Sequence, residues 1–272
     1  MPLRALRLLL CSALLFGNAC SSGEIARRTD RFDHEAAAVS SVRLTSTNGN
    51  LECQRRGDVE RLELDVVLEV GGEDEAEAAE RLRATQVRTT FERGELSAWV
   101  EFPEPRHTLD QAHLSVRAPL PVAAVLKTAN GAIRCTDLER NVDAHTRNGA
   151  IEIRGRHADV LARSVNGAVA LTGVLGRAKG ETKNGALELE LADGAQGGFE
   201  LATENGAIEI SAPRALRGHI LLQTANGDLE AEGAPAIAEK SEGRLEQLRI
   251  ELGVGPASVA RTQNGSVRCN VR

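Results

Sequence analysis

Apolar and polar residues alternate along much of this chain, in short runs that follow Asn-Gly pairs. Eight of these pairs occur, and their asparagines are Asn48, Asn130, Asn148, Asn166, Asn184, Asn205, Asn226 and Asn264. Positions three and five after each asparagine hold an apolar, alanine or cysteine residue, and the position between them is mostly charged. Such alternation predicts a strand with one buried and one exposed face. Glycine accepts the positive φ of a sharp corner, so each pair predicts a corner of the chain.

The corners recur at a nearly fixed interval. From Asn130 to Asn226 successive asparagines are 18, 18, 18, 21 and 21 residues apart, and Asn264 follows 38 residues later. A serine or threonine stands two residues before every one of them. Self-similarity at a fixed period indicates a repeat architecture. The last interval is about two periods, so it predicts a degenerate unit whose strand spans Leu245–Leu252.

Two architectures satisfy this pattern. In a meander, each Asn-Gly pair would be a two-residue turn between antiparallel strands. In a β-solenoid, each pair would be a corner between two strands of one coil, and equivalent residues would stack about 4.8 Å apart. The constant period and the same residue class at each position favour stacking of like on like. We therefore predict an all-β fold, a β-solenoid or β-helix-like stack of 18–21-residue strand repeats with a β-rich N-terminal cap that carries one short helix.

The repeated motif is Thr/Ser-x-Asn-Gly-x-Ile/Leu/Val-x-apolar, as in Thr146–Ile153. It resembles the bacterial β-strand-repeat family of unknown function labelled "putative adhesin". The resemblance covers roughly residues 42–272, including the segment Ala112–Pro119, which in that family leads into the repeats. It implies a solenoid-like fold in a cell-envelope protein, and it implies no catalytic residue.

The first residues have the composition of an export signal. Arg4 and Arg7 precede the apolar run Leu8–Phe16, and small residues follow. This order is typical of a signal peptide over residues 1–19. The apolar run is too short to cross a membrane as a helix.

Gly17–Gly23 resembles a bacterial lipoprotein cleavage box in which Cys20 is the lipidated residue, although leucine is usual where Gly17 stands. The alternative is an ordinary secretory peptide cleaved near Ala19. Several lipid chains on one cysteine anchor a protein durably. We expect an exported cell-envelope protein, periplasmic or surface-exposed, that is held to the membrane by a lipid anchor only.

The chain divides into a lipoprotein-type signal peptide at 1–19, a tether at 20–40 and a β-strand-repeat domain at 41–272. The tether is predicted because its residues are polar and poorly patterned. Within the repeat domain, 54–119 departs from the period and predicts strands and one helix that cap the start of the stack. The remaining repeats follow over 120–272.

The helix of the cap is predicted over Glu73–Arg83, which is acidic at its start and basic at its end, as suits the helix dipole. The final unit, Ser258–Arg272, is predicted to be the last coil of the stack. Its outer edge would then need protection from pairing, either by the charges of Arg268 and Arg272 or by another chain.

Composition excludes one class of partner and supplies little chemistry. The formal net charge is −6, and removal of Arg4 and Arg7 with the signal makes it about −8, whereas a nucleic-acid-binding protein needs a basic stripe. No Cys-x-x-Cys, His-Glu-x-x-His, Gly-x-Ser-x-Gly or phosphate-loop motif occurs. We therefore predict no catalytic, cofactor-binding or metal-binding residue.

One set of carboxylates is a candidate active site. Glu152, Glu188, Glu209 and Glu230 share the outward position of the repeat and could form an acidic ladder. Polysaccharide-cleaving enzymes use a pair of carboxylates, one of them with a raised pKa. Alternating glutamates are equally what a solvent-exposed strand face requires, and the chain has one tryptophan, five phenylalanines and no tyrosine from which to build a sugar platform.

Three of the five cysteines, Cys53, Cys135 and Cys269, share one inward position of the repeat. A Cys53–Cys135 disulfide can form if their two coils are neighbours, since in-register Cα atoms would lie within bonding range. An exported compartment permits such a bond. The alternative is that both cysteines are small apolar fillers of the core.

The sequence predicts a non-enzymatic envelope protein used for adhesion, scaffolding or protein interaction. Its partner would be a protein or another envelope component, without nucleic acid or cofactor, and the pattern sets no oligomeric state. Two alternatives remain: a periplasmic partner in an envelope-stress or regulatory pathway, and a polysaccharide-acting β-helix enzyme.

Overall fold

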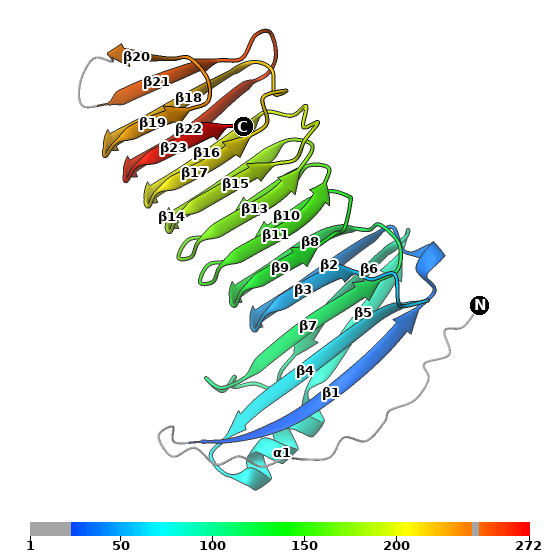
Figure 1. Ribbon diagram of the computed structural model, residues 1–272. Coiled ribbons are helices and arrows are strands. Elements are labelled where there is room, and N and C mark those ends of the chain that lie inside the picture. Colours follow the sequence, from blue (N-terminus) through cyan, green and yellow to red (C-terminus); the bar gives the residue numbers. More distant parts are fainter. Residues whose placement is uncertain (1–22, 241–244) are drawn as a thin grey trace.

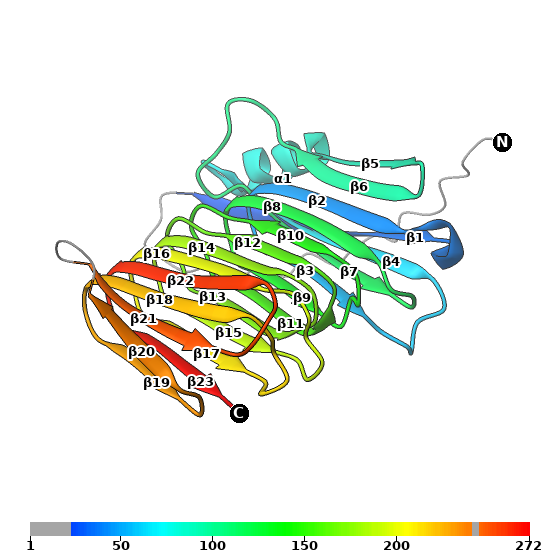
Figure 2. The same cartoon turned by 90° about the horizontal axis from the view of Figure 1, so that it is seen from above.

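The computed structural model describes residues 23–240 and 245–272 of the chain. Its strands form two sheets that face each other in an elongated molecule (Figures 1 and 2). The fold is all-β, as predicted, with one α-helix in the described part of the chain. The signal peptide predicted at 1–19 and the lipidation site predicted at Cys20 lie outside the described residues. Within those residues, no helix is both long and apolar enough to span a membrane.

Sheet A contains 11 strands. In spatial order they are β1 (Glu24–His34), β4 (Leu62–Gly72), β7 (Gln111–Ala118), β3 (Leu51–Arg55), β9 (Ile133–Thr136), β11 (Ile151–His157), β13 (Val169–Val174), β15 (Leu187–Leu191), β17 (Ile208–Ala212), β23 (Val267–Val271) and β19 (Leu229–Glu232).

Sheet B contains 12 strands. In spatial order they are β20 (Ala236–Lys240), β21 (Glu246–Glu251), β18 (His219–Asn226), β22 (Ala257–Asn264), β16 (Phe199–Asn205), β14 (Ala178–Asn184), β12 (Val160–Arg163), β10 (Val142–His145), β8 (Ala123–Asn130), β2 (Ser41–Asn48), β6 (Glu95–Glu101) and β5 (Gln86–Glu92). The helix α1 (Glu75–Ala84) and the 3-10 turn η1 (Ala36–Ala38) complete the described elements.

Each Asn-Gly pair connects a strand of sheet B to a strand of sheet A. For example, β8 ends at Asn130 in sheet B, and β9 begins at Ile133 in sheet A. Equivalent strands of successive units pair in parallel and in register, so Ala144 of β10 lies beside Leu126 of β8 and Ala162 of β12. The meander interpretation is therefore wrong, because a hairpin turn joins antiparallel neighbours within one sheet.

The inward-facing side chains of the two sheets form one narrow core. In sheet B, a central column is occupied by the small residues Ala144, Ala162 and Gly180, all buried. A Cβ atom at Gly180 would lie 3.6 Å from Cδ2 of Leu187 and 3.7 Å from Cδ1 of Leu171, both in sheet A. Small residues of sheet B thus face large ones of sheet A, which allows the side chains of the two sheets to pack closely.

Residues 54–119 extend both sheets beyond the first repeat unit. β7 and β4 continue sheet A next to β3, and β6 and β5 continue sheet B next to β2. The predicted helix is α1, whose N-cap Asp74 accepts a hydrogen bond from the Glu77 N–H at 2.8 Å. Glutamates occupy its first turn and arginines its last, as the dipole favours. The helix packs against β4 and β1 at the end of the molecule opposite to β18–β21 (Figure 1).

A buried ion pair ties this helix to sheet A. Arg81 Nη2 of α1 donates to Asp110 Oδ2 at 2.9 Å, and the Asp110 side chain is completely buried. The same carboxylate accepts hydrogen bonds from the N–H of Gly71 at 3.1 Å and of His107 at 2.8 Å. With these donors in place, the desolvation of the carboxylate is compensated.

The tether predicted over 20–40 is wrong for Glu24–His34, which form β1 at one edge of sheet A. β1 pairs antiparallel with β4 along its whole length. Charged contacts take the place of apolar ones: Arg31 bonds Asp65 at 2.6 Å, and Arg28 donates to two carbonyl oxygens near the end of α1 at 3.0 and 3.1 Å. A strand held by charged partners lacks apolar alternation, so the periodicity of the sequence does not indicate it.

The prediction that the final unit is the last coil is also wrong. β22 lies between β16 and β18 in sheet B, and β23 lies between β17 and β19 in sheet A. Asn264 is therefore a direct neighbour of both Asn205 and Asn226. The inserted unit gains hydrogen-bonded strands on both sides, which a terminal coil lacks.

The stretch predicted as a degenerate unit, Leu245–Leu252, contains β21, and β21 does not stack as a repeat. It pairs antiparallel with β18 on one side and with β20 on the other. An antiparallel addition within sheet B needs no corner into sheet A, which is why no Asn-Gly pair is present between Asn226 and Asn264. β21 and β20 extend sheet B beyond β18, the repeat strand nearest to this edge (Figure 1).

Candidate functional site

The eight repeat asparagines form one hydrogen-bonded ladder along the corner edge of the molecule. Each Nδ2 donates to the Oδ1 of the preceding asparagine at 2.7–2.9 Å, in the spatial order Asn48, Asn130, Asn148, Asn166, Asn184, Asn205, Asn264 and Asn226. At the start of the ladder, Asn48 Nδ2 donates to the Asp110 carbonyl at 3.2 Å. Because the amides serve one another as donor and acceptor, the ladder joins neighbouring units.

The serine or threonine two residues before each asparagine has a second joining role. In seven of the eight units its hydroxyl donates to the carbonyl oxygen of the corner glycine in the neighbouring unit. In the first unit, Ser46 donates instead to the carbonyl oxygens of Asn48 and Ala112, both at 3.0 Å. Thr146 donates to Gly131 at 3.0 Å, and Ser164 donates to Gly149 at 3.0 Å. These hydroxyl side chains are largely buried, so the bonds satisfy polar groups that water does not reach.

The corner glycines are required by close packing between units. A Cβ atom at Gly149 would lie 2.0 Å from the carbonyl oxygen of Gly131, which is far inside contact distance. Gly149 is not among the positive-φ glycines, so positive φ is not the general reason for glycine at these corners. The Asn, Gly and Thr/Ser columns therefore hold the stack together.

Cys53 and Cys135 are neighbours, as the proposed disulfide requires, because β3 and β9 place them opposite each other in register. Both are buried free thiols in the structure, as is Cys269. Burial raises the pKa of Cys53 to about 12, so the thiol form is the stable one in the core. All three side chains fill the core in the manner of small apolar residues.

The four outward glutamates do not form one acidic ladder. Across sheet A, Ala170 separates Glu152 from Glu188, and Arg268 separates Glu209 from Glu230. Only Glu188 and Glu209 lie on neighbouring strands.

The outer two of these glutamates are held in ion pairs. Arg134 bonds Glu152 at 3.0 Å, and Arg268 bonds Glu230 at 2.6 Å. The hydrogen bond from Arg268 lowers the pKa of Glu230. A carboxylate with a lowered pKa suits an ion pair and does not suit a general acid.

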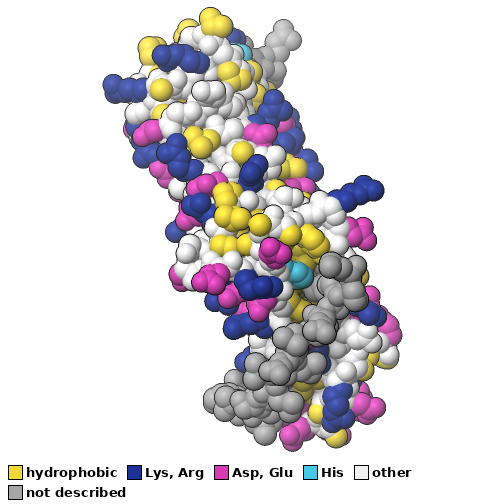
Figure 3. Space-filling view, turned by 90° about the vertical axis from the view of Figure 1, so that its right-hand side faces the viewer, with side chains coloured by type: hydrophobic (Ala, Val, Ile, Leu, Met, Phe, Trp, Pro, Cys, Tyr) yellow, Lys and Arg dark blue, Asp and Glu magenta, His cyan; other side chains and the backbone are white. Residues whose placement is uncertain are grey.

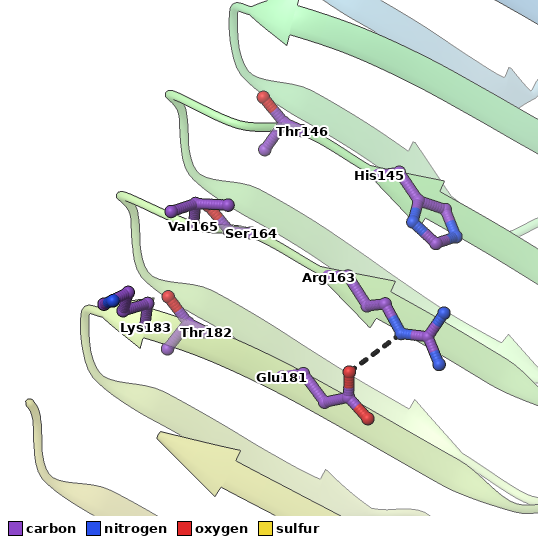
Figure 4. Close-up of a pocket in the computed structure, with 8 residues that line it drawn as sticks. All are labelled: His145, Thr146, Arg163, Ser164, Val165, Glu181, Thr182 and Lys183. Atoms are coloured by element: carbon purple, nitrogen blue, oxygen red, sulfur yellow. Dashed lines mark hydrogen bonds and ion pairs between the residues drawn. The ribbon is translucent and has the colours of Figure 1, made fainter. Parts of the chain in front are cut away.

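A shallow groove crosses three repeat units on the outer face of sheet B (Figure 4). Its volume is about 380 Å³, and it is lined by His145, Thr146, Arg163, Ser164, Val165, Glu181, Thr182 and Lys183. The polar residues His145, Arg163 and Glu181 follow one side of it, and Val165 and Lys183 follow the other (Figure 4).

The groove contains a single carboxylate, Glu181, which Arg163 binds at 2.8 Å and Lys179 binds at 3.0 Å. Burial acts to raise the pKa of Glu181, but the two cations outweigh it and the pKa is lowered. The groove therefore lacks the pair of carboxylates, one of them protonated, that glycoside hydrolysis requires. These groove residues were not predicted from the sequence, although His145, Arg163 and Glu181 all stand three residues before a corner asparagine.

A second hollow of about 450 Å³ is lined by Ser40, Pro121, Ala123, Glu139, Arg140, Asn141 and Ala158. Its one carboxylate, Glu139, is paired with Arg55 at 2.8 Å. In the described part of the chain, no group of three or more His, Cys, Asp or Glu side chains could hold a metal ion. Figure 3 shows one long side of the molecule, where Lys and Arg side chains are interspersed with Asp and Glu.

No protein-family model and no curated protein matches this sequence. Solved structures are similar over most of its length. A "putative adhesin" from Bacteroides fragilis is 14% identical and covers 90% of this chain and 97% of its own, with a TM-score of 0.48. A "putative adhesin" from Parabacteroides distasonis is 8% identical with a TM-score of 0.44, again over 90% of this chain and 97% of its own. A "putative lipid binding protein" from Parabacteroides distasonis is 11% identical, with the same coverage and a TM-score of 0.29.

Proposed function

We propose that this chain is a non-enzymatic cell-envelope protein whose outer sheet faces serve adhesion, scaffolding or protein interaction. The proposal rests on one observation: the repeated residues bond or pack against neighbouring units. Asn148, Gly149 and Thr146 are engaged between units by ladder bonds, close backbone contact and hydroxyl bonds. The groups left exposed are the varied charged side chains of the two outer faces, which are suited to recognising a surface.

The stack is proposed to be one continuous β-solenoid in which each 18–21-residue unit is a coil. The parallel, in-register pairing of equivalent strands in both sheets supports this description. A solenoid presents extended faces whose length grows with the number of coils. Such faces suit contact with a large partner, a protein or another envelope component, and nucleic acid is not an expected partner because the chain is acidic overall.

Anchoring is proposed through a lipid on Cys20. Strand β1 begins at Glu24, four residues after that cysteine. Four extended residues span at most about 14 Å. A lipid on Cys20 would therefore hold the end of the molecule that carries α1 close to the bilayer, because the sheet begins where a long tether was expected. The repeats would then extend away from the membrane along the axis of the stack.

A periplasmic role in an envelope-stress or regulatory pathway is the main alternative, and it differs in the side of the membrane that the repeats occupy. A polysaccharide-acting enzyme has less support. Among the described residues, each of the two hollows contains one carboxylate, Glu181 or Glu139, and each is in an ion pair.

The test is protease treatment of intact cells combined with lipid labelling. It compares the wild type with Cys20→Ala and uses Ser21→Ala as a matched control next to the cleavage point. Adhesion predicts that the wild type and Ser21→Ala are labelled and removed from the cell surface, and that Cys20→Ala is unlabelled. A labelled but protected wild type would place the repeats in the periplasm and exclude adhesion. An unlabelled wild type would exclude the lipid anchor.

A further inference from the structure

The Asn-Gly pairs that build the corners are also the dipeptides most prone to deamidation. In this reaction the glycine backbone nitrogen attacks Cγ of the asparagine, ammonia leaves, and a succinimide forms. Water then opens the ring to an aspartyl or isoaspartyl residue. Glycine favours the reaction because it lacks a Cβ that would hinder the approach of its nitrogen. A folded chain prevents the reaction where that N–H is held in a hydrogen bond and the asparagine side chain is fixed.

Seven of the eight pairs are held in this way. The glycine N–H of each donates to the main-chain carbonyl of the asparagine in the adjacent unit at 2.8–3.1 Å. The donors are Gly49, Gly131, Gly149, Gly167, Gly185, Gly206 and Gly265. Each of these seven glycines is buried or half-buried. Attack on Cγ would require breaking a bond between two units.

Asn226–Gly227 differs because it belongs to the last unit of the ladder. Its strands are β18 and β19, and β19 is the edge strand of sheet A. Within the described residues, the Gly227 N–H has no hydrogen-bond partner, and Gly227 is the one exposed glycine of the eight.

The Asn226 side chain is held on one side only. Its Nδ2 donates to Asn264 Oδ1 at 2.9 Å and to the Gln263 carbonyl at 3.3 Å. Its Oδ1 accepts no hydrogen bond from the described residues, since no further asparagine follows in the ladder. Both the attacking nitrogen and one face of the amide are therefore open to solvent at this corner.

We propose that Asn226 is the deamidation site of the folded protein. The Gly227 nitrogen forms a bond to Cγ of Asn226, the C–N bond to the side-chain nitrogen breaks, and that nitrogen leaves as ammonia with the proton from Gly227. Hydrolysis consumes one water and yields the aspartyl or isoaspartyl product at position 226. No other reactant is needed.

The product weakens the attachment of the last unit. A carboxylate at position 226 cannot donate to Asn264 Oδ1, and it adds a negative charge two residues from Asp228. The isoaspartyl form also adds a backbone atom between β18 and β19, which shifts the residues of β19 relative to β23. The modification would therefore loosen one edge of sheet A.

The test is incubation of the purified native chain at mildly alkaline pH, followed by peptide mapping with a mass spectrometer that resolves the exchange of amide for carboxylate. Asn226 is expected to convert first, roughly tenfold faster than Asn264, since one retained backbone hydrogen bond raises the barrier by about 1.4 kcal/mol. Asn264 is the matched internal control because its Gly265 N–H donates to the Asn226 carbonyl at 2.9 Å.

Two further measurements fix the interpretation. In urea, all eight pairs should convert at comparable rates, because the selectivity comes from the fold. Asn226→Gln should remove the early product from the native protein without speeding the other seven sites. Conversion of Asn264 or any other ladder asparagine as fast as Asn226 in the native protein would overturn the proposal. So would an unmodified Asn226 under conditions that convert the unfolded chain.

Discussion

Replacing Asn148 by alanine removes two bonds of the asparagine ladder and no buried packing. The wild-type side chain donates to Asn130 Oδ1 at 2.7 Å and accepts from Asn166 Nδ2 at 2.8 Å. Both bonds connect units that are also joined by backbone hydrogen bonds, so the change tests the side-chain ladder alone. Arg147→Ala is the control, because Arg147 is the exposed neighbour and its side chain has no hydrogen bond or ion pair among the described residues; its backbone carbonyl, which accepts from the Asn166 N–H at 2.8 Å, is kept in the variant.

The expected loss of stability follows from these contacts. A neutral hydrogen bond contributes about 0.5–1.5 kcal/mol net, and these two are exposed, so Asn148→Ala should lower the free energy of unfolding by about 1–2 kcal/mol. In a chain of this length 1 kcal/mol corresponds to about 2–4 °C, so the melting temperature should fall by roughly 2–8 °C. Arg147→Ala should change it by less than about 1 °C.

Double variants separate the ladder from a general effect of alanine. Asn148→Ala and Asn166→Ala each remove two bonds, but they share one, so the double variant loses three bonds instead of four. The loss of stability in the double variant should therefore be smaller than the sum of the losses in the two single variants by one hydrogen bond, ~1 kcal/mol. Asn148→Ala with Asn184→Ala shares no bond and should be additive.

The assay is urea unfolding followed by circular dichroism, with thermal melts as a second measurement. Additivity in both double variants would refute the ladder as an energetic unit. An unchanged melting temperature for Asn148→Ala itself would show that the backbone contacts alone hold the corner.

Three other predictions follow from single contacts. Gly149→Ala places Cβ 2.0 Å from the Gly131 carbonyl oxygen and should lower the free energy of unfolding, measured in urea, by about 3 kcal/mol or more. Gly57→Ala is the control and should be neutral, because no atom lies within 4 Å of a Cβ at that position. Arg81→Met leaves the buried Asp110 carboxylate without its cation and should lower the free energy of unfolding by about 3–5 kcal/mol. Arg83→Met on the same helix is the control, and equal losses in the two variants would contradict the role of the buried ion pair. Burial lowers the pKa of His157, and the Arg154 carbonyl and Asp137 oppose this effect only in part. As the pH falls, the unfolded chain therefore takes up a proton on His157 before the folded chain does, so the free energy of unfolding should decrease below about pH 6.5. His157→Gln should reduce that slope, and an unchanged slope in melts across this pH range would assign it to other groups.

The repeat units could be predicted from the sequence because their signal is local and recurs. An apolar residue three after each asparagine and a hydroxyl two before it are visible without any structure, and both take the same role in every unit. Thr146 and Ile151 show this: the first bonds the neighbouring unit and the second faces the core. The helix α1 was predictable for the same reason, since its charges follow the dipole within ten residues.

The remaining features depend on contacts between distant segments. β1 reads as a polar tether because Arg31 and Arg28 find their partners in β4 and at the end of α1. The position of β22 between β16 and β18 could not be predicted, because Asn264 carries the same motif as every other corner and the motif does not encode the order of units in space. The groove residue Glu181 was missed because its position in the repeat varies in chemistry from unit to unit.

The place of β22 and β23 has a consequence for synthesis. These strands follow β18 and β19 in the sequence, yet in each sheet they lie between that unit and the unit of β16 and β17. Earlier units can stack in the order in which the ribosome makes them. The unit of β18 and β19 cannot be joined in its final place until β22 and β23 have been made. A chain that stops short of Ala257 would leave strand edges open on both sides of the gap, where proteases and aggregation act on exposed edges. Correct stacking of the unit of β18 and β19 therefore depends on residues that are made after it.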